Sequence, residues 1–255
     1  MDLKERPQKP FSRHPWEVVR ARFFGRLLAE ALPEKGPARI LDVGAGDGFL
    51  AASLAGSPHR PASVTCWDPG YTDDDLAQLP SRSPWGDTDV CFYRDRPSEC
   101  YSVILLLDVL EHVEDDQALL QSLVSANLAP GGKVMLSVPS WRLLYSGHDE
   151  RLGHHRRYDP DDARRLVQRA GLVPERCGGL FHSLLAVRIL EVGLAAVGLR
   201  REPGSATLEW RHGRLLSATA RAVLLLEAAA ASRLGRAGVD LPGLSWWALA
   251  SRGGP

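Results

Sequence analysis

The fold of this chain is decided by the stretch Ile40-Leu41-Asp42-Val43-Gly44-Ala45-Gly46-Asp47-Gly48-Phe49-Leu50. An apolar segment ends in an acid, three glycines follow at alternate positions, and an apolar helical pattern begins. Because glycine lacks a Cβ atom, it adopts backbone angles that other residues avoid. Alternate glycines therefore let the main chain approach a ligand closely. Such turns lie at the carboxyl edge of an open α/β sheet, where ligands of that fold bind.

The spacing of these glycines argues against a dinucleotide site. The dinucleotide fingerprint is G-x-G-x-x-G, but here the third glycine, Gly48, comes one residue early and Phe49 takes its place. The following helix still presents the positive end of its dipole, yet nothing in the turn demands a pyrophosphate. A generic glycine-rich turn between a strand and a helix is the structural alternative.

Composition favours one α/β domain and excludes general nucleic-acid binding. The chain has 255 residues, 44% of them hydrophobic, with 31 basic and 31 acidic residues. A chain without net charge lacks the basic surface that nucleic-acid binding uses. The four cysteines show no C-x-x-C spacing, so we expect free thiols in a reducing compartment and a cytoplasmic protein.

The polar N-terminal stretch and the lengths of the apolar runs indicate where the domain lies and whether the chain crosses a membrane. Residues 1–14 are polar and lack the apolar core of a signal peptide, so we expect a flexible tail before a single domain over 15–252. No uninterrupted apolar run approaches the roughly 18 residues of a membrane span. The best candidate, 215–234, contains Arg221 and Glu227. We therefore expect no transmembrane segment, while peripheral membrane contact and either a monomer or a homodimer are allowed.

Strand patterns alternate with helix patterns, which predicts a doubly wound, Rossmann-like parallel sheet. The segment 101–107 is continuously apolar, as in a strand buried on both faces. Pro130-Gly131-Gly132 predicts a turn, and Asp159 before Pro160 predicts a helix cap. The predicted strands are 38–43, 63–67, 89–93, 101–107, 133–138, 172–177 and 244–250. The predicted helices are 15–32, 49–55, 73–79, 115–128, 159–170, 181–197 and 208–234.

Over about residues 15–252 the sequence resembles the class I S-adenosylmethionine-dependent methyltransferases, closest to their small-molecule branch with type 11 or 12 methyltransferase domains. The resemblance implies a seven-stranded mixed sheet, with a helical insertion at about 181–234 before the last strand. One departure is Tyr101-Ser102, where the family usually has a structural aspartate after an aromatic residue, so local stability is expected to suffer. The matching stretches are Leu41–Phe49, Trp67-Asp68, Leu107–Asp116 and Leu128–Pro139.

The resemblance also implies that S-adenosylmethionine is the cofactor and which residues bind it. Asp42 stands where the family places an acid near the methionyl ammonium, and Asp68 where an acid accepts both ribose hydroxyls. Asp95 stands where many members bind the adenine amino group, and an arginine such as Arg22 reaches the ligand carboxylate in some relatives. A turn-forming Asp68, a surface Asp95 and a solvated Arg22 are the structural alternatives. The full predicted cofactor set is Asp42, Gly44, Gly46, Gly48, Asp68, Asp95, Asp108 and Val109.

The candidate catalytic residues lie in the segment 147–158, Gly-His-Asp-Glu-Arg-Leu-Gly-His-His-Arg-Arg-Tyr. Histidine is the side chain best suited to accept a proton near neutral pH. We predict His148, His155 and Tyr158 as proton acceptors or substrate-orienting groups, with His154 a further candidate. The structural alternative is that the histidines hydrogen-bond the loop and the arginines pair with nearby acids. His148, His154, His155 and Cys177 match no zinc spacing, so we predict no metal.

These residues predict transfer of a methyl group from S-adenosylmethionine to an O, N or C atom of a small-molecule acceptor, apolar or anionic. Such a displacement needs alignment of the acceptor and exclusion of water, with a general base only for a protonated acceptor. A catalytically idle methyltransferase-like scaffold is the alternative. A nicotinamide-dependent oxidoreductase is less favoured, because Phe49 replaces the required glycine.

Overall fold

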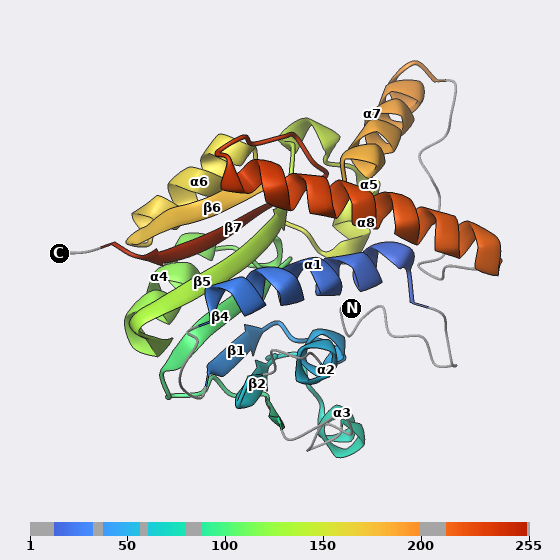
Figure 1. The fold of residues 1–255 in the computed structure, drawn as a ribbon. Coiled ribbons are helices and arrows are strands. Elements are labelled where there is room, and N and C mark those ends of the chain that lie inside the picture. The colour runs from blue at the N-terminus through green and yellow to red at the C-terminus, as the bar shows by residue number, and fades with distance from the viewer. Residues whose placement is uncertain (1–12, 33–37, 57–60, 80–87, 199–212, 254–255) are drawn as a thin grey trace.

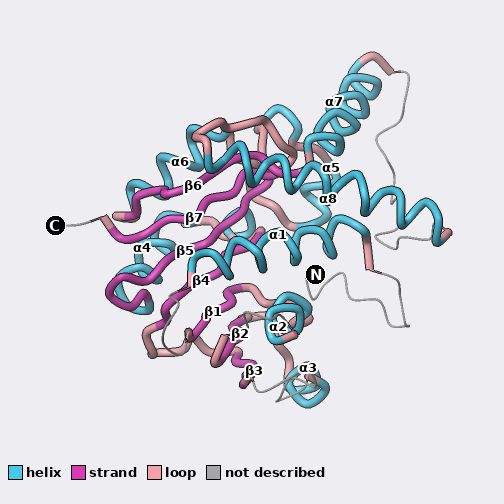
Figure 2. Tube along the Cα trace, in the orientation of Figure 1, coloured by secondary structure: helices cyan, strands magenta, loops and turns pink. Residues whose placement is uncertain are grey.

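A computed structural model describes residues 13–32, 38–56, 61–79, 88–198 and 213–253. Within these ranges the chain forms a seven-stranded sheet with helices on both faces (Figure 1, Figure 2). Nearly all of the predicted tail 1–14 and the first residues of the predicted helix 208–234 fall outside the described residues.

The sheet confirms the predicted doubly wound, mixed architecture. Its strand order is β3-β2-β1-β4-β5-β7-β6, with β7 antiparallel to both neighbours and the other pairs parallel. The order reverses between β1 and β4, and in such sheets ligands bind at the carboxyl edge beside that switch point. The strands are β1 (Arg39–Val43), β2 (Ser63–Trp67), β3 (Asp89–Tyr93), β4 (Tyr101–Leu107), β5 (Leu128–Pro139), β6 (Leu172–Leu180) and β7 (Ser245–Arg252).

Helices cover the two faces of the sheet and enclose two apolar cores. One core joins α1, α2 and α8 to the sheet, and the other joins α4 and α6 to the opposite face. Trp247 enters the first core and Trp246 the second, because successive strand residues point to opposite faces. The helices are α1 (Pro15–Ala31), α2 (Phe49–Ala55), α3 (Asp73–Gln78), α4 (Asp116–Asn127), α5 (Gly147–Leu152), α6 (Pro160–Arg169), α7 (His182–Ala196) and α8 (Arg214–Arg236).

Two local predictions need correction. The predicted strand 133–138 is part of a longer β5 that begins at Leu128, which pairs with Tyr101. The predicted turn at 130–132 is present as an irregularity within that strand, with Gly131 at a φ of 71°. Asp159 stands at the N-cap of α6 but makes no side-chain cap. Its Oδ1 instead accepts a hydrogen bond from the Arg142 backbone at 3.2 Å.

The segment after β5 also contains structure that sequence patterns did not predict. Residues 142–144 form a 3₁₀ turn, and α5 occupies half of the predicted catalytic loop. Ser146 and Asp149 build a reciprocal capping box for α5, and Gly153 ends it in a left-handed conformation. This short helix fixes the side chains of the loop.

Candidate functional site

The turn between β1 and α2 presents bare main chain. Gly44, Gly46 and Gly48 have φ values of 64°, 56° and 71°. A Cβ atom on Gly44 would lie 2.8 Å from Val109, and one on Gly48 would lie 2.8 Å from the Phe92 ring. Side chains are therefore excluded there both by backbone conformation and by space.

A cleft of about 40 Å³ lies beside this turn, between α1 and the ends of β1 and β4. Asp42, Gly44 and Ala45 line it from the β1 side, whereas Glu17 and Arg20 line it from α1. The cleft therefore adjoins the bare main chain of the turn, and the helix α1 forms its opposite wall.

Arginines of α1 and of the segment before it reach the edge of this cleft. Arg13 stacks on the Phe49 ring at 3.8 Å and pairs with Asp47. Arg20 pairs with Asp108 at the end of β4. Arg22, the sequence candidate for this helix, is exposed instead. Arg20 is thus the α1 arginine placed to meet an anionic group in the cleft.

Asp42 is a buried acid whose Oδ2 has no hydrogen-bond partner among the residues that the structure describes. Burial raises its pKa to about 7, while the positive charge of Arg20 lowers the value and Asp68 raises it further. A buried carboxyl without a partner gains free energy when a cationic hydrogen-bond donor reaches it. The floor of the cleft is therefore suited to the ammonium group of a ligand.

Asp68 directs its carboxylate at the glycine turn from the neighbouring strand. Its Oδ2 accepts from the Gly46 backbone at 3.0 Å, and its Oδ1 accepts from Gly70 at 2.9 Å. Tyr71, which the sequence analysis missed, is buried and donates its hydroxyl to the Gly46 carbonyl at 2.8 Å. The only sequence signal for Tyr71 is its place after the Asp-Pro-Gly turn. Together Asp68 and Tyr71 fix the conformation of the glycine turn.

The other predicted cofactor residues occupy different settings. Asp108 ends β4 at a positive φ of 58° and accepts from the buried Ser137 hydroxyl at 2.8 Å. The Val109 side chain packs against Gly44. Asp95 is exposed in the loop after β3. The structure therefore brings Asp42, Asp68 and residues 108–109 to one edge of the sheet, whereas Asp95 is shown only to be exposed to solvent.

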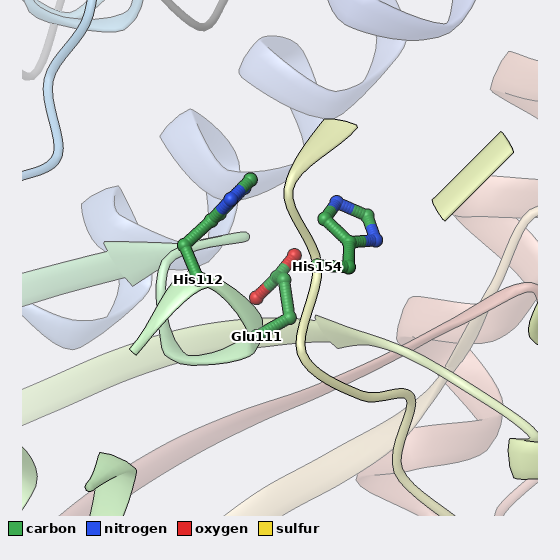
Figure 3. Close-up of side chains that lie close together, drawn as sticks. All are labelled: Glu111, His112 and His154. Atoms are coloured by element: carbon green, nitrogen blue, oxygen red, sulfur yellow. The ribbon is translucent and has the colours of Figure 1, made fainter. Parts of the chain in front are cut away.

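Beyond Val109 lies a second group of polar side chains. Glu111 and His112 belong to the 3₁₀ turn η2 (Leu110–His112), and His154 follows α5 (Figure 3). Each offers a ligand atom within 4.8 Å of the others. Glu111 is fully buried, and burial together with the negative charge of Asp108 raises its pKa well above the usual range. These three residues could hold a metal. Of the four residues that the sequence offered as possible zinc ligands, His154 alone belongs to this group.

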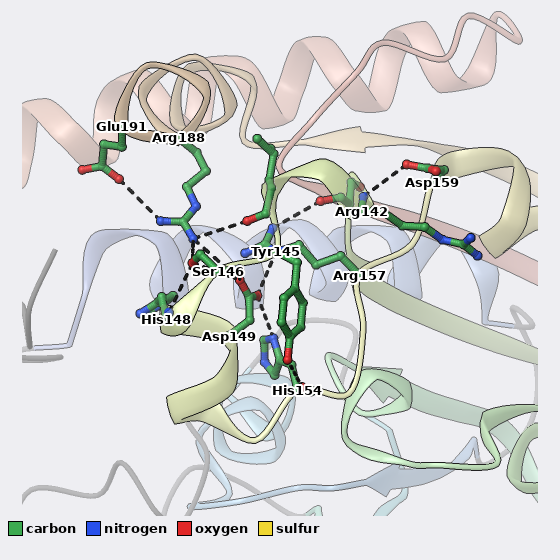
Figure 4. A network of polar contacts seen from close by, with 12 residues as sticks. Arg142, Tyr145, Ser146, His148, Asp149, His154, Arg157, Asp159, Arg188 and Glu191 are labelled. Carbon is green, nitrogen blue, oxygen red and sulfur yellow. Dashed lines mark hydrogen bonds and ion pairs between the residues drawn. The ribbon is translucent and has the colours of Figure 1, made fainter. Parts of the chain in front are cut away.

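Asp149 organises the residues around α5 (Figure 4). Its Oδ1 accepts from Arg157 Nε at 2.7 Å and lies 3.0 Å from His154 Nδ1. Arg188 of α7 reaches its Oδ2 at 3.6 Å. Asp149 is completely buried, yet these partners outweigh desolvation and lower its pKa to about 2. A permanently charged aspartate therefore ties the loop to the inserted helix α7.

The predicted catalytic residues are not gathered at one point. His148 is half-buried on α5, where burial and the charge of Arg188 lower its pKa and keep the ring neutral at pH 7. His155 is exposed, and its backbone N–H donates to the Glu111 carbonyl at 2.7 Å. Tyr158 is buried in the core beneath α4 and α6, and its hydroxyl donates to Asp116 at 2.7 Å. The geometry gives Tyr158 a packing role, and the assignment of His148 as proton acceptor stays a prediction.

The comparisons with known proteins agree with this architecture. A family model described as a methyltransferase domain matches residues 16–176. The ubiquinone biosynthesis O-methyltransferase of Idiomarina loihiensis is 29% identical over 165 residues, covering 58% of this chain and 66% of that protein. The protein of the same name from Xanthomonas axonopodis pv. citri is 33% identical over 136 residues, covering 51% of this chain and 52% of that protein. The chain thus spans about half to two thirds of the length of these relatives.

A solved structure supports the fold over nearly the whole chain. The S-adenosylmethionine-dependent methyltransferase from Mesorhizobium loti superimposes with a TM-score of 0.51. The superposition covers 92% of this chain and 96% of that protein at 20% sequence identity. The shared feature at this level of identity is the arrangement of strands and helices.

The buried Asp42 predicts an unusual pH dependence of stability. Its folded pKa of about 7 lies above the ordinary value of 3.8, so the folded state holds an extra proton between these values. Stability therefore falls as pH rises from about 4 to about 7. Asp42→Asn removes this contribution and is expected to be more stable than the parent at pH 8, by roughly 1–3 kcal/mol, with a smaller difference at pH 5. Urea unfolding at both pH values measures this.

The exposed acid Asp161 on α6 offers a matched control. Asp161→Asn should unfold like the parent protein at both pH values. If Asp42→Asn shows the same small difference from the parent at pH 5 and at pH 8, Asp42 is not titrating as described.

Proposed function

Since this chain belongs to the family of methyltransferase domains, we propose that it transfers a methyl group from S-adenosylmethionine to a small molecule. The observation that carries the proposal is the buried Asp42 beneath the bare main chain of the glycine turn, because its Oδ2 meets no hydrogen-bond donor in the described ranges. S-adenosylmethionine brings an ammonium group, a ribose diol and a carboxylate to such an edge. Each of these groups has a complementary side chain here.

The cofactor groups are matched by residues of three different elements. Asp42 would take the ammonium, which supplies the partner that its Oδ2 lacks. Asp68 ends β2 beside the turn, where its remaining lone pairs can accept both ribose hydroxyls. Arg20 would exchange Asp108 for the ligand carboxylate, which widens a cleft that is too small for a nucleoside as it stands.

The bound cofactor supplies a methyl group already activated by its positive sulfur. The protein has to align an acceptor with that group and keep water out. The relatives' name, O-methyltransferase, supports an oxygen acceptor. A hydroxyl acceptor must lose its proton, and the neutral His148 is suited to receive it.

We expect Asp68→Asn to abolish tight cofactor binding without unfolding the protein. The substitution removes the charge from two hydrogen bonds, each worth about 1.5–3 kcal/mol, so affinity should fall by roughly 100-fold or more. Titration calorimetry with S-adenosylhomocysteine measures the loss. Asp74→Ala, an exposed acid on α3, is the control and should bind like the parent.

Equal affinity of Asp68→Asn and the parent would refute the ribose assignment. An absence of binding by the parent itself would instead favour the idle scaffold. Binding of a reduced nicotinamide cofactor in its place would favour an oxidoreductase.

The two helices inserted between β6 and β7, α7 and α8, form a second surface that bears on function. Among the described residues one segment, Leu215–Arg236, is long and apolar enough to cross a membrane, with a mean hydropathy of 1.4. Leu224 and Ala228 within it are buried against the domain, so α8 lies on the protein rather than standing apart from it. We therefore interpret α8 as a peripheral element of the domain.

Several large apolar side chains of α7 and α8 face solvent. Leu215 and Leu226 are 84% and 73% exposed, and Leu190 of α7 is 61% exposed. Figure 1 shows both helices projecting beyond the sheet. Exposed arginines on α8, such as Arg221 and Arg233, complement anionic headgroups. We propose a cytoplasmic protein that rests these helices on a membrane to meet an apolar acceptor.

The membrane proposal predicts binding to vesicles that contain anionic lipid. A double variant, Leu215→Ser with Leu226→Ser, should lose most of this binding, because the exposed apolar side chains insert among the acyl chains. Val173→Ser, which removes an exposed apolar side chain from β6, should bind like the parent. Vesicle flotation provides the measurement, and flotation of neither parent nor variants would contradict the proposal.

A further inference from the structure

Glu111, His112 and His154 bring one carboxylate and two imidazoles together from two separate segments (Figure 3). We propose that these three residues bind a divalent transition metal, with Zn²⁺ the best match. Two histidines and one carboxylate form a donor set found at catalytic zinc and related sites, which keep a further coordination position open. Magnesium and calcium are disfavoured because they prefer oxygen ligands.

The state of Glu111 is the first observation in favour of a metal. The side chain is 0% exposed, and within the described part of the chain neither carboxyl oxygen has a hydrogen-bond partner. Buried polar groups are nearly always satisfied, and each exception requires an explanation. A metal ion bound to this carboxylate would supply the missing partner and compensate the burial of its charge.

The orientation of His154 is the second observation. Its Nδ1 lies 3.0 Å from the Asp149 carboxylate, so that nitrogen is engaged and Nε2 is left for a metal. A carboxylate behind a histidine is the usual outer partner of a metal ligand, because it fixes the ring orientation and raises ligand basicity. Asp149 is itself held by Arg157, which makes this support rigid. Figure 4 shows Asp149 linking Arg157 and His154.

The position of His112 completes the set. Its ring lies edge-on to that of His154, with centroids 4.7 Å apart and an interplanar angle of 82°. The positive charges of Arg20 and Arg157 act on Glu111, and both side chains are already paired, with Asp108 and Asp149 respectively. These ion pairs reduce the electrostatic repulsion that the two guanidinium groups would exert on a metal ion at the cluster.

The location of the cluster suggests what the metal would do, and this step rests on the proposed function. The turn η2 begins directly after Val109, which packs against Gly44 of the cofactor turn. A metal here would bind an acceptor hydroxyl and lower its pKa. The hydroxyl proton would pass to a base such as His148, after which the new O–C bond forms as the S–C bond of the cofactor breaks.

Metal binding is tested first without any cofactor. Tag-free parent protein should bind one Zn²⁺ by calorimetry, and Co²⁺ should give the visible absorption of a low-coordinate nitrogen and oxygen site. Glu111→Gln keeps the size and shape of the side chain, so it should fold with the metal-free Tm of the parent. It should nevertheless lose at least about 100-fold in Zn²⁺ affinity and the Zn²⁺-induced rise in Tm.

Three further variants separate the site from nonspecific binding. His154→Asn should weaken Zn²⁺ binding as Glu111→Gln does, and Asp149→Asn should weaken it by about 10–100-fold as an orienting partner. His155→Ala removes the exposed neighbouring histidine and should change Zn²⁺ affinity less than about 3-fold. The proposal is overturned if the parent binds no Zn²⁺, or if His155→Ala reduces affinity as much as Glu111→Gln.

Cofactor calorimetry distinguishes the two proposals from each other. Parent protein that binds Zn²⁺ but not S-adenosylhomocysteine would leave the metal site standing and refute the methyltransferase assignment. Parent protein that binds S-adenosylhomocysteine but does not bind Zn²⁺ would support the methyltransferase assignment and refute the metal site.

Discussion

The architecture of the site depends on one constraint, which is the burial of the Asp42 carboxyl beneath a turn that has glycine at every second position. Strand β1 is central in the sheet and brings Asp42 into a desolvated position beside α1. The adjoining glycines leave the main chain bare, and Tyr71 and Asp68 hold it in that shape. An acid in this setting is costly unless a cation arrives, which is why the cleft is best understood as a ligand site rather than as a packing defect.

Charge complementarity extends this constraint along the sheet edge. Asp42, Asp68 and Asp108 lie at the carboxyl ends of β1, β2 and β4, so acids gather at the switch point of the strand order. Arg20 of α1 lines the cleft on the side opposite the glycine turn and pairs with Asp108. Further along, Asp149 fixes both the loop after β5 and the inserted helix α7 through arginine pairs. The same edge therefore offers a place for a cationic cofactor and, beyond it, polar groups for an acceptor.

Local sequence patterns were sufficient for most of the fold, because buried strands and amphipathic helices are encoded residue by residue. The glycine turn and Asp42 could be recognised for the same reason. Arg20 and Arg22 show a limit of that approach. Side chains two positions apart on a helix point in directions about 200° apart, and only the packing of α1 decides which of the two arginines faces the cleft. The β5 boundary was missed because Leu128 pairs with Tyr101 on the far side of the irregular turn at Pro130-Gly131-Gly132, and no local pattern shows that pairing.

Tertiary contacts decided the remaining site residues. Tyr158 looked like a loop residue, yet its backbone pairs with Ser140 beyond the end of β5 and its ring fills a core. Glu111 and His154 are distant in sequence, and no spacing rule joins them. Only the crossover from β4 through β5 to α5 places them together.

The role of Asp42 is tested most directly by the protons exchanged when a ligand binds. Calorimetry with S-adenosylhomocysteine at pH 6, in buffers of different ionisation enthalpy, counts those protons. Because the free carboxyl titrates at about 7 and the ligand ammonium favours its charged form, binding should release up to one proton at pH 6 and progressively fewer toward pH 8. Binding with no proton release at pH 6, or release that persists unchanged in Asp42→Asn, would contradict the account.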